Sequence, residues 1–177
     1  MLTNFQLEYI IYSSHRGIPR KKRYNMKITF AGHSVISSEK KIKDAVKEEL
    51  RKIASEEEFV TFYIGGYGEF DRLCSCACRE LGEERDGIEV VYVAPYISLS
   101  EQTKVKELLE SGKCDTSIYP PIENTPPKFA IIKRNEWMMT NADVVIAYVE
   151  HEYGGAYRSL QTARRKKKKI INIYDII

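Results

Sequence analysis

The sequence predicts an α/β fold, a Rossmann-like doubly wound sheet of about five mostly parallel strands with helices on both faces. Two observations predict it. Short runs rich in β-branched residues alternate along the chain with longer segments whose apolar residues recur every three or four positions. The short runs are mostly apolar, as in strands covered by helices on both faces. Strands are expected over residues 27–31, 59–64, 88–94, 144–149 and 170–174.

Helix signals lie between these strands. The serines at 37–38 are placed to cap a first helix, and Ser98 with Glu101 has capping-box spacing for a third. A double proline suits the entry of a fourth helix. Residues 111–127 are rich in proline and are expected to form an irregular surface flap. Helices are predicted over about residues 39–54, 70–81, 99–110, 128–141 and 154–168.

The first 25 of the 177 residues differ from the rest. They contain five Lys or Arg and one acid, a net charge of +4, whereas residues 26–177 contain 23 and 24, a net charge of −1. We expect residues 1–25 to be an N-terminal extension produced by an upstream start site, with Met26 as the natural start. The alternative is a basic arm that contacts phosphate. A single domain is expected over residues 26–177.

Composition excludes several classes of protein. No run of 18 apolar residues occurs, so no membrane partner is expected. The chain begins without a signal-peptide pattern, and its four cysteines are expected to be reduced thiols in the cytoplasm. Cys74, Cys76 and Cys78 lack the turn-type spacing of a zinc site, and Cys74 and Cys78 fall on the apolar helix face. The sequence therefore predicts no metal and no cofactor.

Glycine-rich turns follow three of the expected strands. They are Gly32-His33-Ser34, Gly65-Gly66-Tyr67-Gly68 and Gly154-Gly155. In a parallel sheet these turns meet at one edge, where ligands bind and where helix N-termini favour anions. Two Gly-Gly pairs there favour a phosphate-binding site over tight turns alone. Neither pair matches a Walker A loop or the dinucleotide fingerprint.

Polar residues near these turns are further candidates, each with an ordinary alternative. Arg134 suits a bidentate phosphate contact and Asn135 a sugar or base contact, unless both are solvated helix residues. His33 suits a phosphate contact, proton transfer or a turn cap. Asp71 and Glu152 are the candidate catalytic acids for cleavage of an N-glycosidic bond, unless they are solvated loop residues.

Taken in order, these motifs resemble one known family. They are Gly32-His33, Gly65-Gly66-x-Gly68 with Asp71, Arg134-Asn135-x-x-Met138, Asn141-x-Asp143 before a strand, and Gly154-Gly155 opening a helix. The sequence is similar to the SLOG superfamily (the Smf/DprA and Lonely-guy group), and most to its YpsA-like branch, over about residues 26–174. The resemblance implies a Rossmann-like fold that binds nucleotides or nucleotide-derived ligands, with some members binding single-stranded DNA and others releasing a base from a nucleotide.

Carried over residue by residue, the resemblance implies that Gly65, Gly66, Gly154 and Gly155 cradle phosphate and that Arg134 and Asn135 contact the ligand. The sequence departs from the family where Ser34 replaces the Arg of Gly-His-Arg, and where Ile64, Glu69 and Asp71 replace the Pro, Thr and Glu of the hydrolase motif. These departures argue against hydrolase activity.

Three functions therefore compete. The first is binding of a nucleotide or nucleotide-derived small molecule by a sensor or sequestering protein, through residues that lie in or beside the glycine turns (Gly32, His33, Gly65, Gly66, Gly68, Asp71, Arg134, Asn135, Gly154, Gly155). The second is a nucleotide N-glycosidase or phosphoribohydrolase. The third is single-stranded DNA binding through the basic run 164–169, which is not favoured because the run is expected opposite the glycine edge. A homodimer is expected by analogy with related folds.

Overall fold

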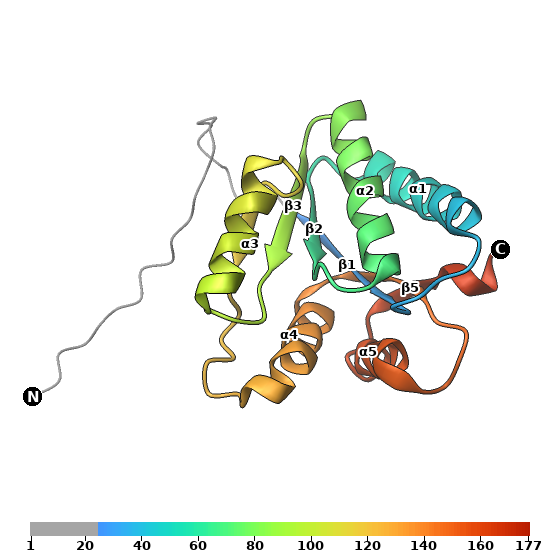
Figure 1. The fold of residues 1–177 in the computed structure, drawn as a ribbon. Coiled ribbons are helices and arrows are strands. Elements are labelled where there is room, and N and C mark those ends of the chain that lie inside the picture. The colour runs from blue at the N-terminus through green and yellow to red at the C-terminus, as the bar shows by residue number, and fades with distance from the viewer. Residues whose placement is uncertain (1–24) are drawn as a thin grey trace, which may run out of the picture.

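A computed structural model describes residues 25–177 and confirms the predicted fold class (Figure 1). Six parallel strands form one sheet in the order β4-β3-β2-β1-β5-β6. The predicted N-terminal extension lies outside the described residues, apart from Asn25. The strands are β1 (Met26–Gly32), β2 (Val60–Ile64), β3 (Ile88–Val93), β4 (Thr116–Ile118), β5 (Val144–Tyr148) and β6 (Lys169–Asn172).

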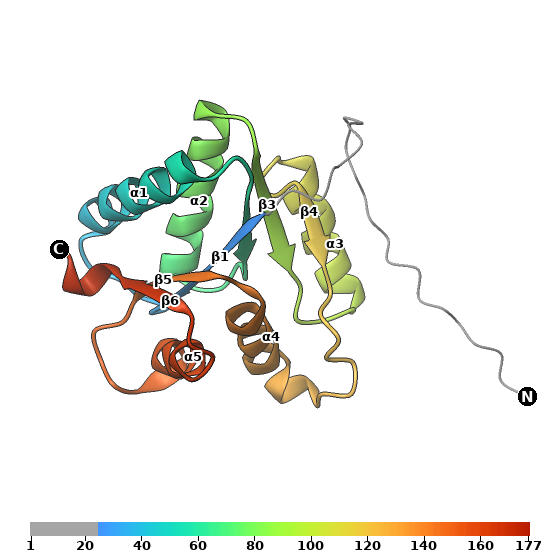
Figure 2. The ribbon, with the colours of Figure 1, turned by 180° about the vertical axis from the view of Figure 1, so that it is seen from behind.

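Helices cover both faces of the sheet, as Figures 1 and 2 show. Because crossovers between parallel strands are right-handed, three helices that lead outward from β1 to β4 lie on one face. The chain then returns to β5 on the far side of β1, which places the last two helices on the other face. The first three are α1 (Glu39–Glu56), α2 (Glu69–Glu84) and α3 (Leu99–Glu110), and the others are α4 (Pro127–Asn141) and α5 (Gly154–Arg165).

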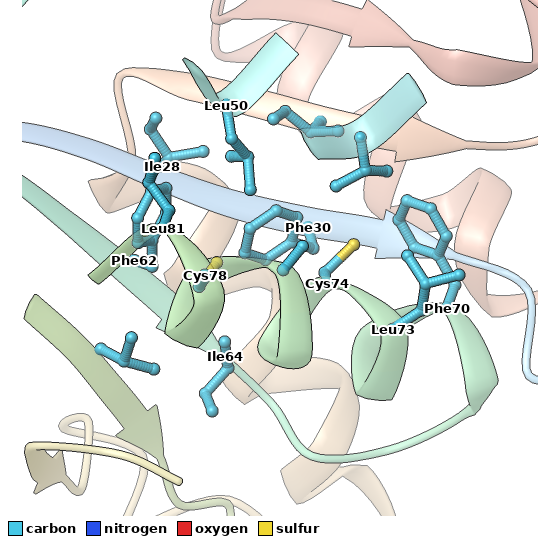
Figure 3. Close-up of a cluster of buried hydrophobic side chains, with 14 of the residues drawn as sticks. Ile28, Phe30, Leu50, Phe62, Ile64, Phe70, Leu73, Cys74, Cys78 and Leu81 are labelled. Carbon is cyan, nitrogen blue, oxygen red and sulfur yellow. The ribbon is translucent and has the colours of Figure 1, made fainter. Parts of the chain in front are cut away.

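The larger apolar core lies between the sheet and α1 and α2 (Figure 3). Phe30 and Phe62 stack in it with ring centroids 6.2 Å apart. Cys74 and Cys78 are fully buried in the same core, whereas Cys76 is exposed, which confirms that the first two are packing residues. The helical stripes predicted from the sequence therefore form this core.

The prediction of an irregular flap over residues 111–127 is partly wrong, because this segment contains β4. The strand has only three residues, all polar or half-buried, so it carries no periodic signal. Asp115 fixes it to the sheet: its carboxylate accepts a hydrogen bond from the Val90 N–H (2.7 Å) and one from Arg79 (2.9 Å). A strand of this kind depends on its partner rather than on its own sequence.

The helix caps follow the sequence in one case and not in another. The Ser98 hydroxyl accepts a hydrogen bond from the Glu101 N–H (3.3 Å), as the capping box predicts. Ser38 occupies the N-cap position of α1 but has left-handed backbone geometry (φ 61°) and makes no side-chain cap. Within residues 25–177, no helix is long and apolar enough to cross a membrane.

Replacing Asp115 with alanine should destabilise the fold by about 1–3 kcal/mol, because the mutation leaves the Val90 N–H without its partner. Asp115→Asn should cost less than about 1 kcal/mol, since the amide oxygen still accepts from Val90 and only the half-exposed ion pair with Arg79 is lost. Urea unfolding measures both. Glu83→Ala, an exposed acid on α2, is the control, and an Asp115→Ala variant as stable as Glu83→Ala would contradict the assignment.

Candidate functional site

The ends of β1, β2 and β5 meet at the carboxyl edge of the sheet, the edge at which the strands end. The strand order reverses between β1 and β5, so the loops that follow these two strands flank the topological switch point. Residues 32–34, 65–68 and 150–155 all lie at this edge. The structure thus brings most of the predicted ligand-binding residues to one edge, in two groups.

The first group surrounds the turn formed by Gly65 and Gly66 after β2. The Arg134 guanidinium, fully buried on α4, donates through Nη1 to the Gly65 carbonyl (2.7 Å) and the Val93 carbonyl (2.8 Å). The Asp71 carboxylate accepts hydrogen bonds from the N–H groups of Gly65 (3.2 Å) and Gly66. The turn is therefore bonded on its carbonyl side by an arginine and on its amide side by an aspartate.

Burial sets the electrostatics of this group. It raises the pKa of the Asp71 carboxyl, while the nearby Arg134 charge and the backbone N–H groups oppose that rise. Burial also lowers the pKa of Arg134 and of Lys104. The Lys104 ammonium lies 4.2 Å from the centre of the Tyr67 ring, a cation–π contact at the open side of the turn.

The sequence indicates only a capping-box position for Glu101 and does not show that its side chain is buried near this group. Its side chain is buried and accepts a hydrogen bond from the Tyr92 hydroxyl. Burial and this bond raise the pKa of Tyr92. Lys104, one turn along α3, was missed, since a lone lysine on a helix gives no sequence signal.

The glycines differ in what surrounds them. A Cβ on Gly32 would lie 2.1 Å from the Phe70 ring, and one on Gly68 (φ +86°) would lie 2.9 Å from the Ser34 Cα. Packing alone explains these two residues. Gly154 and Gly155, by contrast, have nothing within 4 Å of such a Cβ. They begin α5 at an exposed N-terminus that no side chain caps, which leaves backbone N–H groups there for an anion.

The second group lies between the ends of β1 and β5. The His33 Nε2 atom accepts a hydrogen bond from the Glu150 N–H (3.1 Å). The His33 and His151 rings lie 4.7 Å apart, and His151 stacks on Tyr153 at 5.1 Å. Burial and the neighbouring His151 lower the pKa of His33. Asn172 holds this loop by bonding both the N–H and the carbonyl of Val149 (3.0 and 3.1 Å).

The remaining predicted residues lie apart from one another. Asn135 is half-buried next to Arg134 on α4, and Glu152 is exposed in the loop before α5. Asp71 already bonds the Gly65–Gly66 turn. Catalytic roles for Asp71 and Glu152, and direct ligand contact by Arg134 and Asn135, stay predictions.

A groove of about 380 Å³ lies between α4 and α5, which run side by side beneath the sheet in both views (Figures 1 and 2). This volume falls in the range of about 300–1,000 Å³ that is usual for small-ligand pockets. The half-buried Trp137 packs against Tyr63 at 5.4 Å and lines the groove. The other lining residues are polar or charged (Lys133, Glu136, Thr140, Asn141, Thr162, Arg165, Lys166).

The basic run 164–169 begins in the last turn of α5 and ends at the start of β6. Because β6 is parallel to the other strands, its start lies at the edge opposite the glycine turns, as expected. The groove has no signal in the sequence, because its aromatic and basic residues come from segments about 30 positions apart. On each helix taken alone, the charged and polar residues that line the groove resemble those of any solvent-exposed helix face.

Two solved structures have the same fold. DNA processing protein A (DprA) from Streptococcus pneumoniae matches with a TM-score of 0.56 and 16% identity, over 82% of this chain and 49% of that one. DprA from Helicobacter pylori, described for its single-stranded DNA binding mode, matches with a TM-score of 0.53 and 15% identity, over 82% of this chain and 63% of that one. This chain thus spans 49% and 63% of their lengths.

At these identities the likeness establishes the fold alone, and membership of the SLOG superfamily stays a prediction from the motifs. The YpsA-like branch stays a prediction. No protein-family model matches the chain, and no curated protein sequence does so.

Two glycine variants distinguish a packed turn from an open one. Gly65→Ala should destabilise the fold by about 1–3 kcal/mol, because its Cβ would lie 2.6 Å from the Arg134 Nη1 atom, which two carbonyls hold in place. Gly155→Ala should be neutral, or stabilising by up to about 1 kcal/mol, since it adds a methyl group in open space on a helix. Urea unfolding compares them, and equal stability of the two variants would contradict the packing described.

Proposed function

We propose that the chain binds single-stranded DNA in the groove between α4 and α5. The observation that supports this most is Trp137, a partly open aromatic face among Lys133, Arg165 and Lys166. Proteins that bind single strands without sequence preference combine an aromatic stacking surface with a groove of positive charge. A base stacks on the indole in this arrangement, and the phosphates on either side contact the cations.

The charge distribution supports the same site. Lys133 is paired with Glu136 (2.8 Å), so the groove has Arg165 and Lys166 as its unpaired cations. Within residues 25–177, no carboxylate forms an ion pair with any cation of the run 164–169. Residues 26–177 have a net charge of −1, so this run is a local concentration of positive charge on a nearly neutral domain.

The two DprA structures support the proposal at the level of the fold. One of the two similar structures is described as binding single-stranded DNA, and this chain shares its fold over 82% of its own length. A shared fold alone does not imply a shared function, so the proposal depends on the aromatic and basic side chains of the groove.

A second candidate is a nucleotide or nucleotide-derived small molecule at the carboxyl edge. The open N-terminus of α5 at Gly154 and Gly155 favours it, since it lies beside the β1–β5 switch point where such ligands bind. It also fits the resemblance to the YpsA-like branch. Hydrolysis of that nucleotide is less favoured, because both oxygens of Asp71 already bond the Gly65–Gly66 turn. The two candidate sites lie at different places, so variants of each separate them.

Trp137→Ala should weaken binding of a labelled oligothymidine, measured by fluorescence anisotropy, by about 5- to 150-fold. Loss of one stacked base costs about 1–3 kcal/mol. Phe129→Ala is the matched control, because Phe129 is an exposed aromatic residue on the same helix but outside the groove. Equal effects of the two substitutions, or none from Trp137→Ala, would contradict the proposed site.

Lys166→Ala should weaken binding about equally for all sequences and reduce the dependence of log affinity on log salt by about 0.7, the value for one single-strand phosphate contact. Lys106→Ala, on α3 across the sheet, removes the same charge far from the groove and should leave the salt slope unchanged. A wild-type affinity that does not change between low and high salt would exclude this mode of binding.

A further inference from the structure

We propose that His33, Glu150 and His151 form a binding site for a divalent transition metal ion of the zinc type. Their potential ligand atoms, two imidazole nitrogens and a carboxylate oxygen, all lie within 4.8 Å of one another. The residues come from two loops, one after β1 and one after β5. The site is separate from the groove between α4 and α5 and does not depend on the proposed function.

The donor set fits this class of metal. Imidazole suits zinc, copper, iron and nickel, and two histidines with one carboxylate are a common set for zinc sites that keep an open position. Ligand atoms on a tetrahedral zinc ion lie about 3.4 Å apart, given bonds of about 2.0–2.1 Å. The three side chains therefore need to approach one another by about 1.4 Å at most.

The loops allow that approach. Glu150 and His151 are exposed, so their side chains can rotate toward the half-buried His33 without disturbing the core. The backbone just before Glu150 is fixed independently of the metal, since Asn172 bonds both the N–H and the carbonyl of Val149. The site thus combines a fixed backbone with adaptable side chains.

A metal ion bound to His33 would replace the hydrogen bond that His33 now accepts from Glu150. His33 accepts the Glu150 N–H at Nε2, so this nitrogen has an available lone pair and Nδ1 bears the proton. A metal bound at Nε2 takes the place of the N–H donor, and no proton leaves the ring. The lost hydrogen bond is worth about 1 kcal/mol, which is small beside a metal–imidazole bond.

The place of the site in the fold also suggests what would complete the coordination. His151 lies three residues before Gly154, where the uncapped N-terminus of α5 begins. The α5 N–H groups favour an oxygen anion, the class of ligand that the open coordination position of the metal ion would also take.

The test is calorimetric titration of the purified full chain with Zn²⁺ alone, together with Co²⁺ titration followed by visible absorption. We expect one ion to bind, and His151→Ala and Glu150→Gln each to lower the affinity about tenfold or more. Both residues are exposed, so neither variant should unfold, and circular dichroism checks this.

Cys76→Ser and Glu152→Gln are the matched controls, because Cys76 is an exposed thiol and Glu152 is the neighbouring acid outside the cluster. Both should bind Zn²⁺ like the wild type. Wild-type protein that binds no ion, unchanged affinity in His151→Ala, or loss of binding in Cys76→Ser would each overturn the proposal. None of these outcomes alters the expected effect of Trp137→Ala on DNA binding.

Discussion

The hydrogen bonds of the buried Arg134 guanidinium are the interaction on which the Gly65–Gly66 turn and the position of α4 both depend. Burying an arginine is costly unless its charge and N–H groups find partners. Here the Gly65 and Val93 carbonyls bind it, Asp71 lies nearby, and the Tyr67 ring centre is 5.3 Å away. These contacts attach α4 to the ends of β2 and β3. The requirement for glycine at position 65 follows, because a side chain there would occupy the space of the guanidinium.

The position of α4 in turn determines the groove. Trp137 lies about one helical turn after Arg134 and packs against Tyr63 on β2, while Lys133 and Thr140 line the side toward α5. Helix α5 connects the two candidate sites: its open N-terminus lies at the carboxyl edge and its basic C-terminus lines the groove. Cations at that end also interact favourably with the helix dipole, so the basic run is compatible with a stable helix.

Sequence patterns predicted the architecture because long apolar strands and amphipathic helices bury their residues in a regular way. β4 escaped prediction because its three half-buried residues at a sheet edge are ordered by Asp115 and by β3 rather than by their own preference. The site was predictable only as a set of loops at one edge. Long-range contacts decide that Arg134 bonds carbonyls instead of facing solvent, and they decide which glycines are packed. The spacing of residues along the sequence does not encode these contacts. The groove and the His33–His151 pair arise in the same way, from segments distant in sequence.

Binding in the groove is tested most directly by the intrinsic fluorescence of Trp137, the only tryptophan in the chain. Titration with unlabelled oligothymidine at low salt should quench and shift this emission with a saturable curve, and added salt should reverse the change. Because no other tryptophan contributes, the signal reports on the groove alone. An oligonucleotide that binds the chain by anisotropy while the emission of Trp137 stays constant would contradict the account and direct attention to the carboxyl edge.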